Sequence, residues 1–242
     1  GIWLQNYKDT IQFFLNQGYA IIGFSMPSIS SVPGYKYPAY QGRDLNYHNE
    51  YPVLESGTFS PIYFFMEPIN EAINYVNSQY SYSRIAMSGL SGGAWTVHLY
   101  SAIDPRILKS YPVAGSLPLS MYVTTGEWGD YEQTLPLLYH IADYPYLYLL
   151  AGYGTGRGQL QILNRNDDCC FPVNFKGQNR EPTIRQYESE VNGVLTKFAK
   201  GKFSVWVDEN TPHMITANAR NQILADLNSG TPSDTTPPSV SL

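Results

Sequence analysis

One serine in this chain lies in a pattern that supports nucleophilic chemistry. Residues 89–93 read Gly-Leu-Ser-Gly-Gly, which places Ser91 at the centre of a G-x-S-x-G motif. A strand-like run, 84–88, precedes the motif, and a helix-like stretch, 92–103, follows it. A sharp strand-to-helix turn of this kind projects the serine hydroxyl above a sheet, and glycine two residues to either side avoids a clash. The motif therefore predicts that Ser91 is a nucleophile.

The nucleophile needs a base beside it, and the chain has four histidines. His213 lies between the last expected strand and the last expected helix, in a loop that opens at the same sheet edge as the motif, because parallel strands all end there. His98 follows Ser91 by seven residues on one helix, so a packing role is favoured. His48 and His140 lie in irregular regions, where a structural role is favoured over substrate contact. His213 is the predicted base.

A carboxylate should orient the imidazole, and in the chain order of a Ser-acid-His site it comes between the other two. No Asp or Glu occurs in 152–166, and the first carboxylate after that stretch is Asp167. Asp167 is therefore the predicted acid. The carboxylates that stay open as alternatives are Asp168 first, then Asp143 and Asp208.

The stretches MSGLSGGAW, at 87–95, and AIDPRI, at 102–107, resemble the α/β-hydrolase superfamily, and especially secreted bacterial acyl and carbohydrate esterases. This resemblance implies an acyl-enzyme mechanism with no metal or organic cofactor, and an extracellular location. It also implies an oxyanion site that uses the backbone N–H of Gly92 and a second N–H from a loop after an early strand. The chain opens almost directly into the helix expected after that loop, so we expect the early strands and this donor upstream of Gly1.

The elements around these residues alternate between helix and strand. Helical stripes are expected over 6–16, from Ser60-Pro61 to about 76, and over 92–103, 184–198 and 214–227. Strands are expected over 19–25, 84–88, 109–114 and 203–207, with a further strand at either 146–151 or 159–163. The alternation predicts an α/β fold, a doubly wound, mostly parallel sheet with helices on both faces.

The chain is expected to form one catalytic domain with a short tail. The domain would span 1–228, with an irregular insertion at about 116–145. The Ser/Thr/Pro-rich segment 229–242 is typical of an extended linker, and we expect it to lead to a further module of the same polypeptide.

The composition excludes several classes of protein. With 43% apolar and 14% charged residues, the chain is neither disordered nor a coiled coil. No apolar run approaches the roughly 20 residues that a membrane span needs. A net charge of −5 without a Lys/Arg cluster argues against a nucleic acid partner. A small-molecule or glycan ester remains as the expected partner.

The chain is rich in tyrosine, with 21 residues of this type. A tyrosine has an apolar ring and a polar tip, which suits a surface that contacts sugars, although a tyrosine-rich core explains the content equally well. The long loop 26–59 is a weak candidate for the substrate wall. Its candidate residues are Tyr35, Tyr37, Tyr40, Tyr47 and His48.

The only two cysteines, Cys169 and Cys170, are adjacent in the chain. Neighbouring Cα atoms lie about 3.8 Å apart, below the usual range for a disulfide, so a bridge between them would be a vicinal one. A vicinal disulfide that stiffens the loop of the acid and a pair of small packed residues are equally supported. No His or Cys cluster in the sequence supplies a four-ligand zinc site, so no metal is expected.

These residues together predict a serine esterase that cleaves a carboxylic ester, with an acylated carbohydrate as the candidate substrate. A peptidase of the same fold would share every motif. A binding module that has lost catalysis is the alternative from another class, and the Ser, acid and His in family order argue against it.

Overall fold

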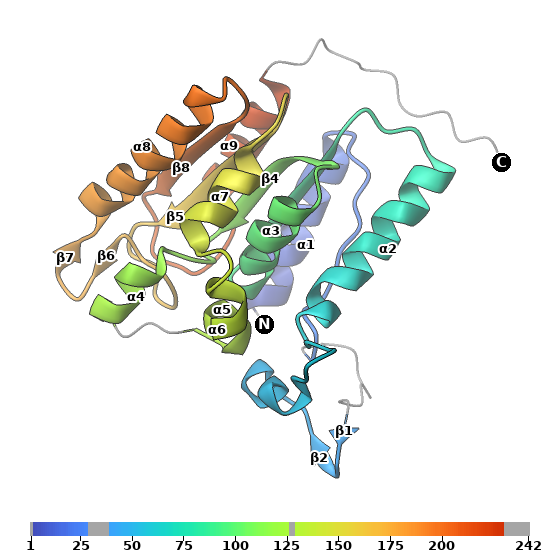
Figure 1. Cartoon of the computed structure of the whole chain (residues 1–242). Helices are drawn as coiled ribbons and strands as arrows, with labels where there is room; N and C mark the ends of the chain where they lie inside the picture. The colour runs from blue at the N-terminus through green and yellow to red at the C-terminus, as the bar shows by residue number, and fades with distance from the viewer. Residues whose placement is uncertain (1, 29–38, 126–128, 230–242) are drawn as a thin grey trace.

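The computed structural model describes residues 2–28, 39–125 and 129–229, and its centre is a four-stranded sheet between two layers of helices (Figure 1). The strands are all parallel, and their order is β3 (Ile85–Leu90), β4 (Ile107–Val113), β5 (Gly158–Asn164) and β8 (Lys202–Asp208). Two short antiparallel hairpins lie apart from the sheet: β1 (Ala39–Tyr40) with β2 (Arg43–Asp44), and β6 (Asn174–Phe175) with β7 (Gln178–Asn179). The predicted α/β fold with a mostly parallel sheet is confirmed.

Helices cover both faces of this sheet. One face carries α1 (Ile2–Asn16) and α9 (Ala217–Asn228), and the other carries α3 (Gly92–Ile103), α7 (Tyr144–Gly152) and α8 (Glu181–Lys197), as Figure 1 shows. The remaining helices are α2 (Tyr63–Gln79), which packs beside α3, the short α4 (Leu119–Thr125), α5 (Tyr131–Thr134) and α6 (Pro136–Tyr139), and the 3-10 helix η1 (His48–Leu54). Across the described ranges, every helix is too short or too polar to cross a membrane.

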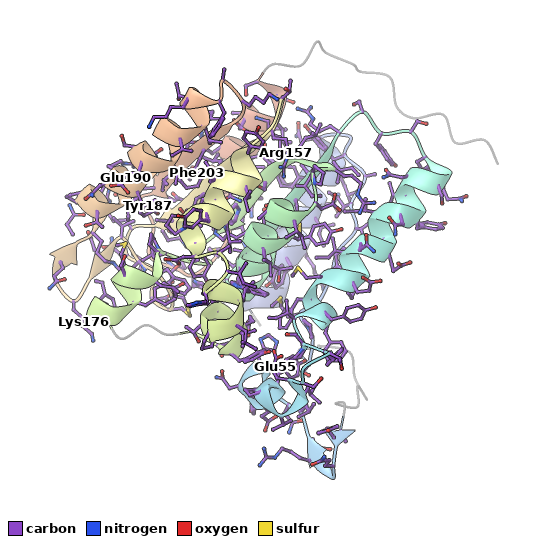
Figure 2. All side chains as sticks on the ribbon, viewed as in Figure 1. Glu55, Arg157, Lys176, Tyr187, Glu190 and Phe203 are labelled. Atoms are coloured by element: carbon purple, nitrogen blue, oxygen red, sulfur yellow. A yellow bond between two sulfur atoms is a disulfide. The ribbon has the colours of Figure 1, made fainter. Side chains whose placement is uncertain are left out.

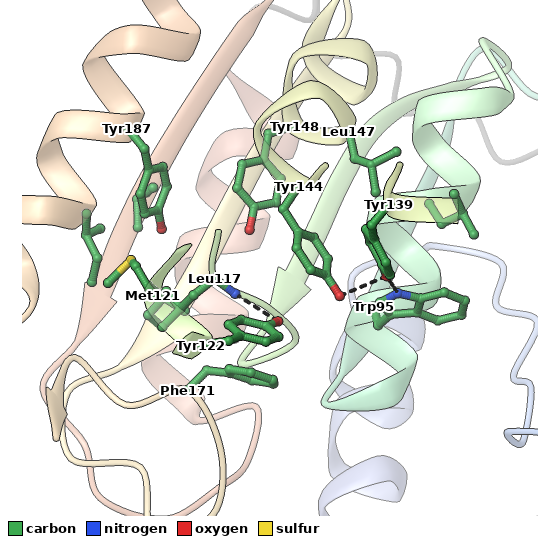
Figure 3. Packing of buried hydrophobic residues seen from close by; sticks show 14 of the residues in the cluster. Trp95, Leu117, Met121, Tyr122, Tyr139, Tyr144, Leu147, Tyr148, Phe171 and Tyr187 are labelled. Atoms are coloured by element: carbon green, nitrogen blue, oxygen red, sulfur yellow. Dashed lines mark hydrogen bonds between the residues drawn. The ribbon is translucent and has the colours of Figure 1, made fainter. Parts of the chain in front are cut away.

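Tyrosine builds much of the core on the α3, α7 and α8 face (Figure 3). The ring of Tyr148 stacks on Phe203 with centroids 5.1 Å apart, and Tyr187 lies beside the same ring (Figure 2). The hydroxyls of these buried rings are satisfied: Tyr187 donates to Gln161 Oε1 over 2.9 Å, and Tyr148 bonds the Ser116 hydroxyl over 2.9 Å. The core therefore accounts for part of the tyrosine content, which is one of the two explanations that the sequence left open, while other tyrosines are exposed.

The expected strand at 19–25 does not form. This stretch pairs with no strand among the described residues, and Ile22 and Phe24 are 53% and 49% exposed. A strand is held by hydrogen bonds to a neighbour, so an apolar run alone does not create one. The edge of β3 opposite β4 is likewise unpaired within the described part of the chain.

The choice between two apolar stretches is resolved in favour of 159–163, which forms β5, while 146–151 lies within α7. The carboxylate of Asp143 accepts the Tyr144 N–H over 2.6 Å, and Pro145 occupies the first turn. Both are start signals of a helix, and they decide the conformation of a stretch whose apolar residues fit either element.

The other expected elements form with shifted ends. Helix α2 begins at Tyr63, just after the expected start at Ser60-Pro61. The insertion 116–145 contains α4, α5 and α6. Of the expected linker only Ser229 lies within the described residues, so the further module, like the strands upstream of Gly1, stays a prediction.

Gly115 offers a test of the packing between the end of β4 and α3. A Cβ at this position would lie 2.4 Å from Ala94 Cβ and 2.8 Å from the Trp95 backbone nitrogen. We expect Gly115→Ala to lower the free energy of unfolding by roughly 1–3 kcal/mol, measured by urea denaturation, because the backbone of α3 has to move to make room for the added methyl group. The matched control is Gly193→Ala in α8, where a Cβ meets nothing within 4 Å and helix propensity favours alanine. Equal stability of Gly115→Ala and wild type would contradict this packing.

Candidate active site

Ser91 lies at a tight turn between β3 and α3. Its backbone has φ 58° and ψ −125°, a left-handed conformation that is strained for a residue with a side chain. The Ser91 N–H donates to the Val113 carbonyl of β4 over 3.0 Å, so the neighbouring strand holds the turn. This strand–serine–helix geometry is the one that presents a hydroxyl above the carboxyl edge of a parallel sheet.

The two glycines of the motif contribute differently to this turn. A Cβ at Gly89 would lie 2.4 Å from the Gly93 carbonyl oxygen, so only glycine fits there. A Cβ at Gly93 would meet nothing within 4 Å, apart from the helix's own backbone. The expectation that both positions need glycine to avoid a clash is therefore right for Gly89 and wrong for Gly93, because only the first faces the backbone of the following turn.

A histidine–carboxylate pair lies at the same edge of the sheet. Both oxygens of Asp167 lie 2.9 Å from His213 Nδ1, and both side chains are buried. Asp167 follows β5 and His213 follows β8, so the pairing joins two loops that are 46 residues apart in the chain. An ionised carboxylate at Nδ1 orients the ring.

Asp167 is held by three further donors. Its Oδ1 accepts the backbone N–H groups of Cys169 and Cys170 over 2.9 and 2.8 Å, and its Oδ2 accepts Asn164 Nδ2 over 2.8 Å. Burial on its own raises the pKa of this carboxyl, but the hydrogen bonds from His213, Cys170 and Asn164 outweigh burial, and the pKa lies below its usual value. Asp167 is therefore ionised at neutral pH.

The alternative carboxylates are engaged elsewhere. Asp168 Oδ1 accepts the backbone N–H of His213 over 2.9 Å, so it anchors the histidine loop and not the ring. Asp143 caps α7, and Asp208 accepts the hydroxyl of Thr216 at the start of α9. Among the predicted acids, the structure brings Asp167 to the imidazole.

The sheet brings the three predicted residues to one edge. Ser91, Asp167 and His213 follow β3, β5 and β8, whose carboxyl ends point the same way. Backbone and side-chain bonds continue across this edge: Ala114 N–H donates to the Ile162 carbonyl over 2.9 Å, and Asn164 Nδ2 contacts the Pro212 carbonyl at 3.3 Å.

Sequence reasoning missed Asn6 and Asn164, which position the histidine loop. Asn6 is 3% exposed, and its amide donates to the Ile215 carbonyl over 2.8 Å and accepts the Ile215 N–H over 3.1 Å. This pair of bonds attaches α1 to the residues after His213. A polar residue on the buried side of an amphipathic helix was the available signal, but its partner lies 209 residues away and has no mark in the sequence.

Cys169 and Cys170 form a vicinal disulfide, with Sγ atoms 2.03 Å apart and Cα atoms 3.7 Å apart. The two residues are also the ones whose N–H groups converge on Asp167 Oδ1. The sequence left open a vicinal disulfide and a pair of small packed residues. The structure contains the disulfide, which lies in the turn that holds the Asp167 carboxylate.

The remaining histidines have other surroundings. His98 is fully buried and bonded to Gln159, and burial lowers its pKa to about 3, so it stays neutral in the core, in line with the favoured packing role. His140 is exposed. His48 is 4% exposed and its ring nitrogens contact Glu132 and the Pro27 carbonyl, in line with the structural role that the sequence favoured for it.

The tyrosines of the expected substrate wall divide into two groups. Tyr40 and Tyr47 are 41% and 72% exposed, on β1 and just before η1. Tyr35 and Tyr37 lie outside the described residues.

Gly92, the expected oxyanion donor, is the first residue of α3, where a backbone N–H has no acceptor within the helix. A Cβ at this position would lie 2.9 Å from Met26 Cε and 3.8 Å from Glu132 Oε1. Residues of two other segments therefore border the turn, and the start of α3 is lined by a methionine and a buried carboxylate.

No protein-family model matches this chain, and no curated protein matches it. Solved structures with similarity include a methylesterase, with 16% identity, a TM-score of 0.45 and coverage of 64% of this chain and 32% of its own. A glucuronoyl esterase from Solibacter usitatus has 12% identity, a TM-score of 0.47 and coverage of 72% and 52%. An acetyl xylan esterase from Paenibacillus sp. R4 has 14% identity, a TM-score of 0.43 and coverage of 65% and 49%. The chain thus spans a third to a half of the length of these proteins.

The lowered pKa of Asp167 predicts a pH-dependent contribution to stability. A carboxyl whose folded pKa lies below its unfolded value, about 3.9, stabilises the fold above that value and loses this contribution as the pH falls through the folded pKa. We expect Asp167→Asn to lower the free energy of unfolding at pH 7 by roughly 1–3 kcal/mol and by progressively less below pH 4. Denaturation curves at a series of pH values measure this difference.

The control for Asp167→Asn is Asp168→Asn, which keeps a carbonyl oxygen for the His213 N–H and lies at an exposed position. Its effect at pH 7 should be smaller. A destabilisation by Asp167→Asn that stays constant from pH 7 to pH 3 would sink the assignment of a paired, ionised Asp167.

The vicinal disulfide should act locally, on the turn that holds Asp167. A bridge between neighbours closes almost no loop, so it restricts the unfolded chain little, and its effect lies in the placement of the two N–H donors. We expect reduction, or the double variant Cys169→Ser/Cys170→Ser, to lower the thermal midpoint by about 2–4 °C, the shift that corresponds to roughly 1 kcal/mol. Reductant should leave the double variant unaffected, and an unchanged midpoint on reduction of wild type would refute this role.

Proposed function

We propose that this chain is a serine hydrolase that cleaves a carboxylic ester through an acyl-enzyme. The observation that carries the proposal is the buried His213–Asp167 pair, which lies at the sheet edge to which the turn of Ser91 also belongs. A nucleophile on a strained turn, a base and an orienting acid are the three groups that acyl transfer by serine requires.

Each residue has one part in the proposed reaction. His213 Nε2 takes the proton of the Ser91 hydroxyl as its oxygen bonds to the ester carbonyl carbon. The Gly92 N–H donates to the oxyanion that forms, and the partial positive charge at the start of α3 adds to this stabilisation. The imidazolium then gives its proton to the departing alcohol, and the acyl group stays on Ser91.

Water completes the cycle by the same steps. His213 takes a proton from water, whose oxygen attacks the acyl carbonyl, and the acid product leaves as the proton returns to Ser91. Asp167 keeps its charge throughout, because its lowered pKa favours the ionised form, and this charge stabilises the imidazolium in both halves of the reaction.

We propose an acylated carbohydrate as the substrate class and an extracellular place of action. The resemblance of the motif around Ser91 to carbohydrate esterases supports the first, together with the exposed rings of Tyr40 and Tyr47. The Cys169–Cys170 bridge supports the second, because disulfides persist in oxidising compartments.

Labelling with a fluorophosphonate and hydrolysis of p-nitrophenyl acetate test the proposed function. We expect one adduct, on Ser91, and a loss of kcat of about 10³-fold or more in Ser91→Ala and His213→Ala, because these groups act as a unit. The exposed His140 supplies the matched control, and His140→Gln should retain wild-type activity.

Two results would count against the proposal in different ways. Labelling of Ser91 with turnover of a peptide p-nitroanilide, and none of esters, would make the chain a peptidase. Absence of any adduct on Ser91 in the folded protein would favour a binding module of this fold.

A further inference from the structure

A second polar cluster lies beside the turn of Ser91, built from His48 of η1, Glu132 of α5 and Asp130, which caps α5. His48 Nδ1 is 3.0 Å from Glu132 Oε1 and 3.7 Å from Asp130 Oδ2. One ligand atom from each residue lies within 4.8 Å of the other two. The side chains of His48 and Glu132 are 3% and 1% exposed, whereas that of Asp130 is 53% exposed.

The hydrogen bond of His48 Nε2 determines whether Nδ1 carries a hydrogen in the neutral ring. His48 Nε2 lies 2.7 Å from the Pro27 carbonyl oxygen, which only accepts hydrogen bonds, so Nε2 carries the ring hydrogen. In the neutral ring Nδ1 then presents a lone pair to the two carboxylates. A backbone carbonyl that holds one ring N–H while the other nitrogen faces acidic groups is the usual support of a metal-binding histidine.

Charge and an unpartnered oxygen indicate what lies between these groups. A proton on His48 Nδ1 supplies one positive charge, whereas the two carboxylates carry two negative charges. A divalent ion beside a neutral ring balances both negative charges. Glu132 Oε2 is buried and has no hydrogen-bond partner among the described residues. A proton shared between His48 Nδ1 and Glu132 Oε1 leaves Oε2 without a partner. A metal ion, by contrast, can coordinate both oxygens of one carboxylate.

We propose that His48, Glu132 and Asp130 bind a divalent metal ion, and that the ion is zinc. One imidazole nitrogen with two carboxylates is a mixed nitrogen and oxygen set, which suits zinc, whereas calcium prefers oxygen ligands alone. The exposed side chain of Asp130 gives the ion a path from solvent. Among the described residues, a second close group of Cys169, Cys170 and His213 offers no thiolate, because its sulfurs form a disulfide.

The ligands are held in place by residues outside the cluster. Asn49 Nδ2 donates to Asp130 Oδ1 over 3.2 Å and leaves Oδ2 toward His48. The hydroxyl of Tyr139 accepts Trp95 Nε1 at 2.5 Å, as Figure 3 shows. The same hydroxyl donates to the Glu132 carbonyl over 3.0 Å, so Trp95 of α3 helps to fix the backbone of Glu132. A ligand set whose backbone is fixed in this way is preorganised for an ion.

The position of the cluster gives the ion a consequence for the neighbouring turn. Glu132 Oε1 lies 3.8 Å from the place of a Cβ on Gly92, and a bare carboxylate there would oppose negative charge at the start of α3. A bound divalent ion cancels this charge and joins η1 to α5. The ion is thus a structural and electrostatic partner of the turn, and its binding does not depend on the proposed esterase activity.

The test is zinc binding by the metal-stripped full chain, measured by competition with a chromophoric chelator. We expect one equivalent of tightly bound zinc and a rise of the thermal midpoint with zinc concentration. Glu132→Gln and His48→Gln should weaken binding by roughly tenfold or more, and Asp130→Asn should do so without disturbing the core, since its side chain is half exposed. His140→Gln, which removes an exposed histidine, should bind as wild type does.

Three outcomes would overturn the proposal: no zinc bound at one equivalent, zinc binding unaffected by Asp130→Asn and Glu132→Gln, or tighter binding of calcium than of zinc. The first would leave a proton as the ion between His48 and Glu132. Since zinc is measured without substrate, failure of this proposal is separate from failure of Ser91 to react with the fluorophosphonate.

Discussion

The parallel pairing of four strands is the constraint on which the candidate site depends. Parallel strands end at a common edge, and the register that joins β5 to β8 over their whole length aligns the loops that carry Asp167 and His213. The same edge receives the turn of Ser91, whose N–H is bonded to the end of β4. Ser91 and His213, which are 122 positions apart in the chain, thus lie at the same edge of the sheet, because the pairing of the strands sets where each strand ends.

At this edge of the sheet, the carboxylate of Asp167 is held by hydrogen bonds from four donor groups. It accepts from an imidazole, an amide and two backbone N–H groups, so that a buried charge has a donor on each side. Such satisfaction is what permits a carboxylate to remain ionised away from water. The neighbouring Asp168 has the same side chain and holds the His213 backbone, so two adjacent carboxylates divide the ring and the loop between them. Asp167 and Asp168 differ in role because they lie at different positions relative to the Cys169–Cys170 turn, although they are the same residue type.

The tyrosines connect the core to the surroundings of the site. Trp95, in the first turn of α3, reaches the Glu132 backbone through the hydroxyl of Tyr139, and Glu132 in turn contacts His48. Rings that fill the core therefore also place polar groups near the start of α3, since each hydroxyl has to find a partner when its ring is buried. The polar cluster proposed to bind zinc is an extension of this core, reached through hydrogen bonds that no local pattern reveals.

The sequence by itself determined the elements with strong local signals: the G-x-S-x-G turn, the alternation that predicts a parallel sheet, and the order in which Ser91, Asp167 and His213 occur. These follow from periodicity and backbone sterics, which act over a few residues. Only the tertiary structure decided that the stretch 19–25 forms no strand, since it finds no partner among the described residues. It also decided the partner of His48, because Glu132 lies 84 residues away in the chain. Pairing and burial are properties of two segments at once, and one segment's residues do not encode them alone.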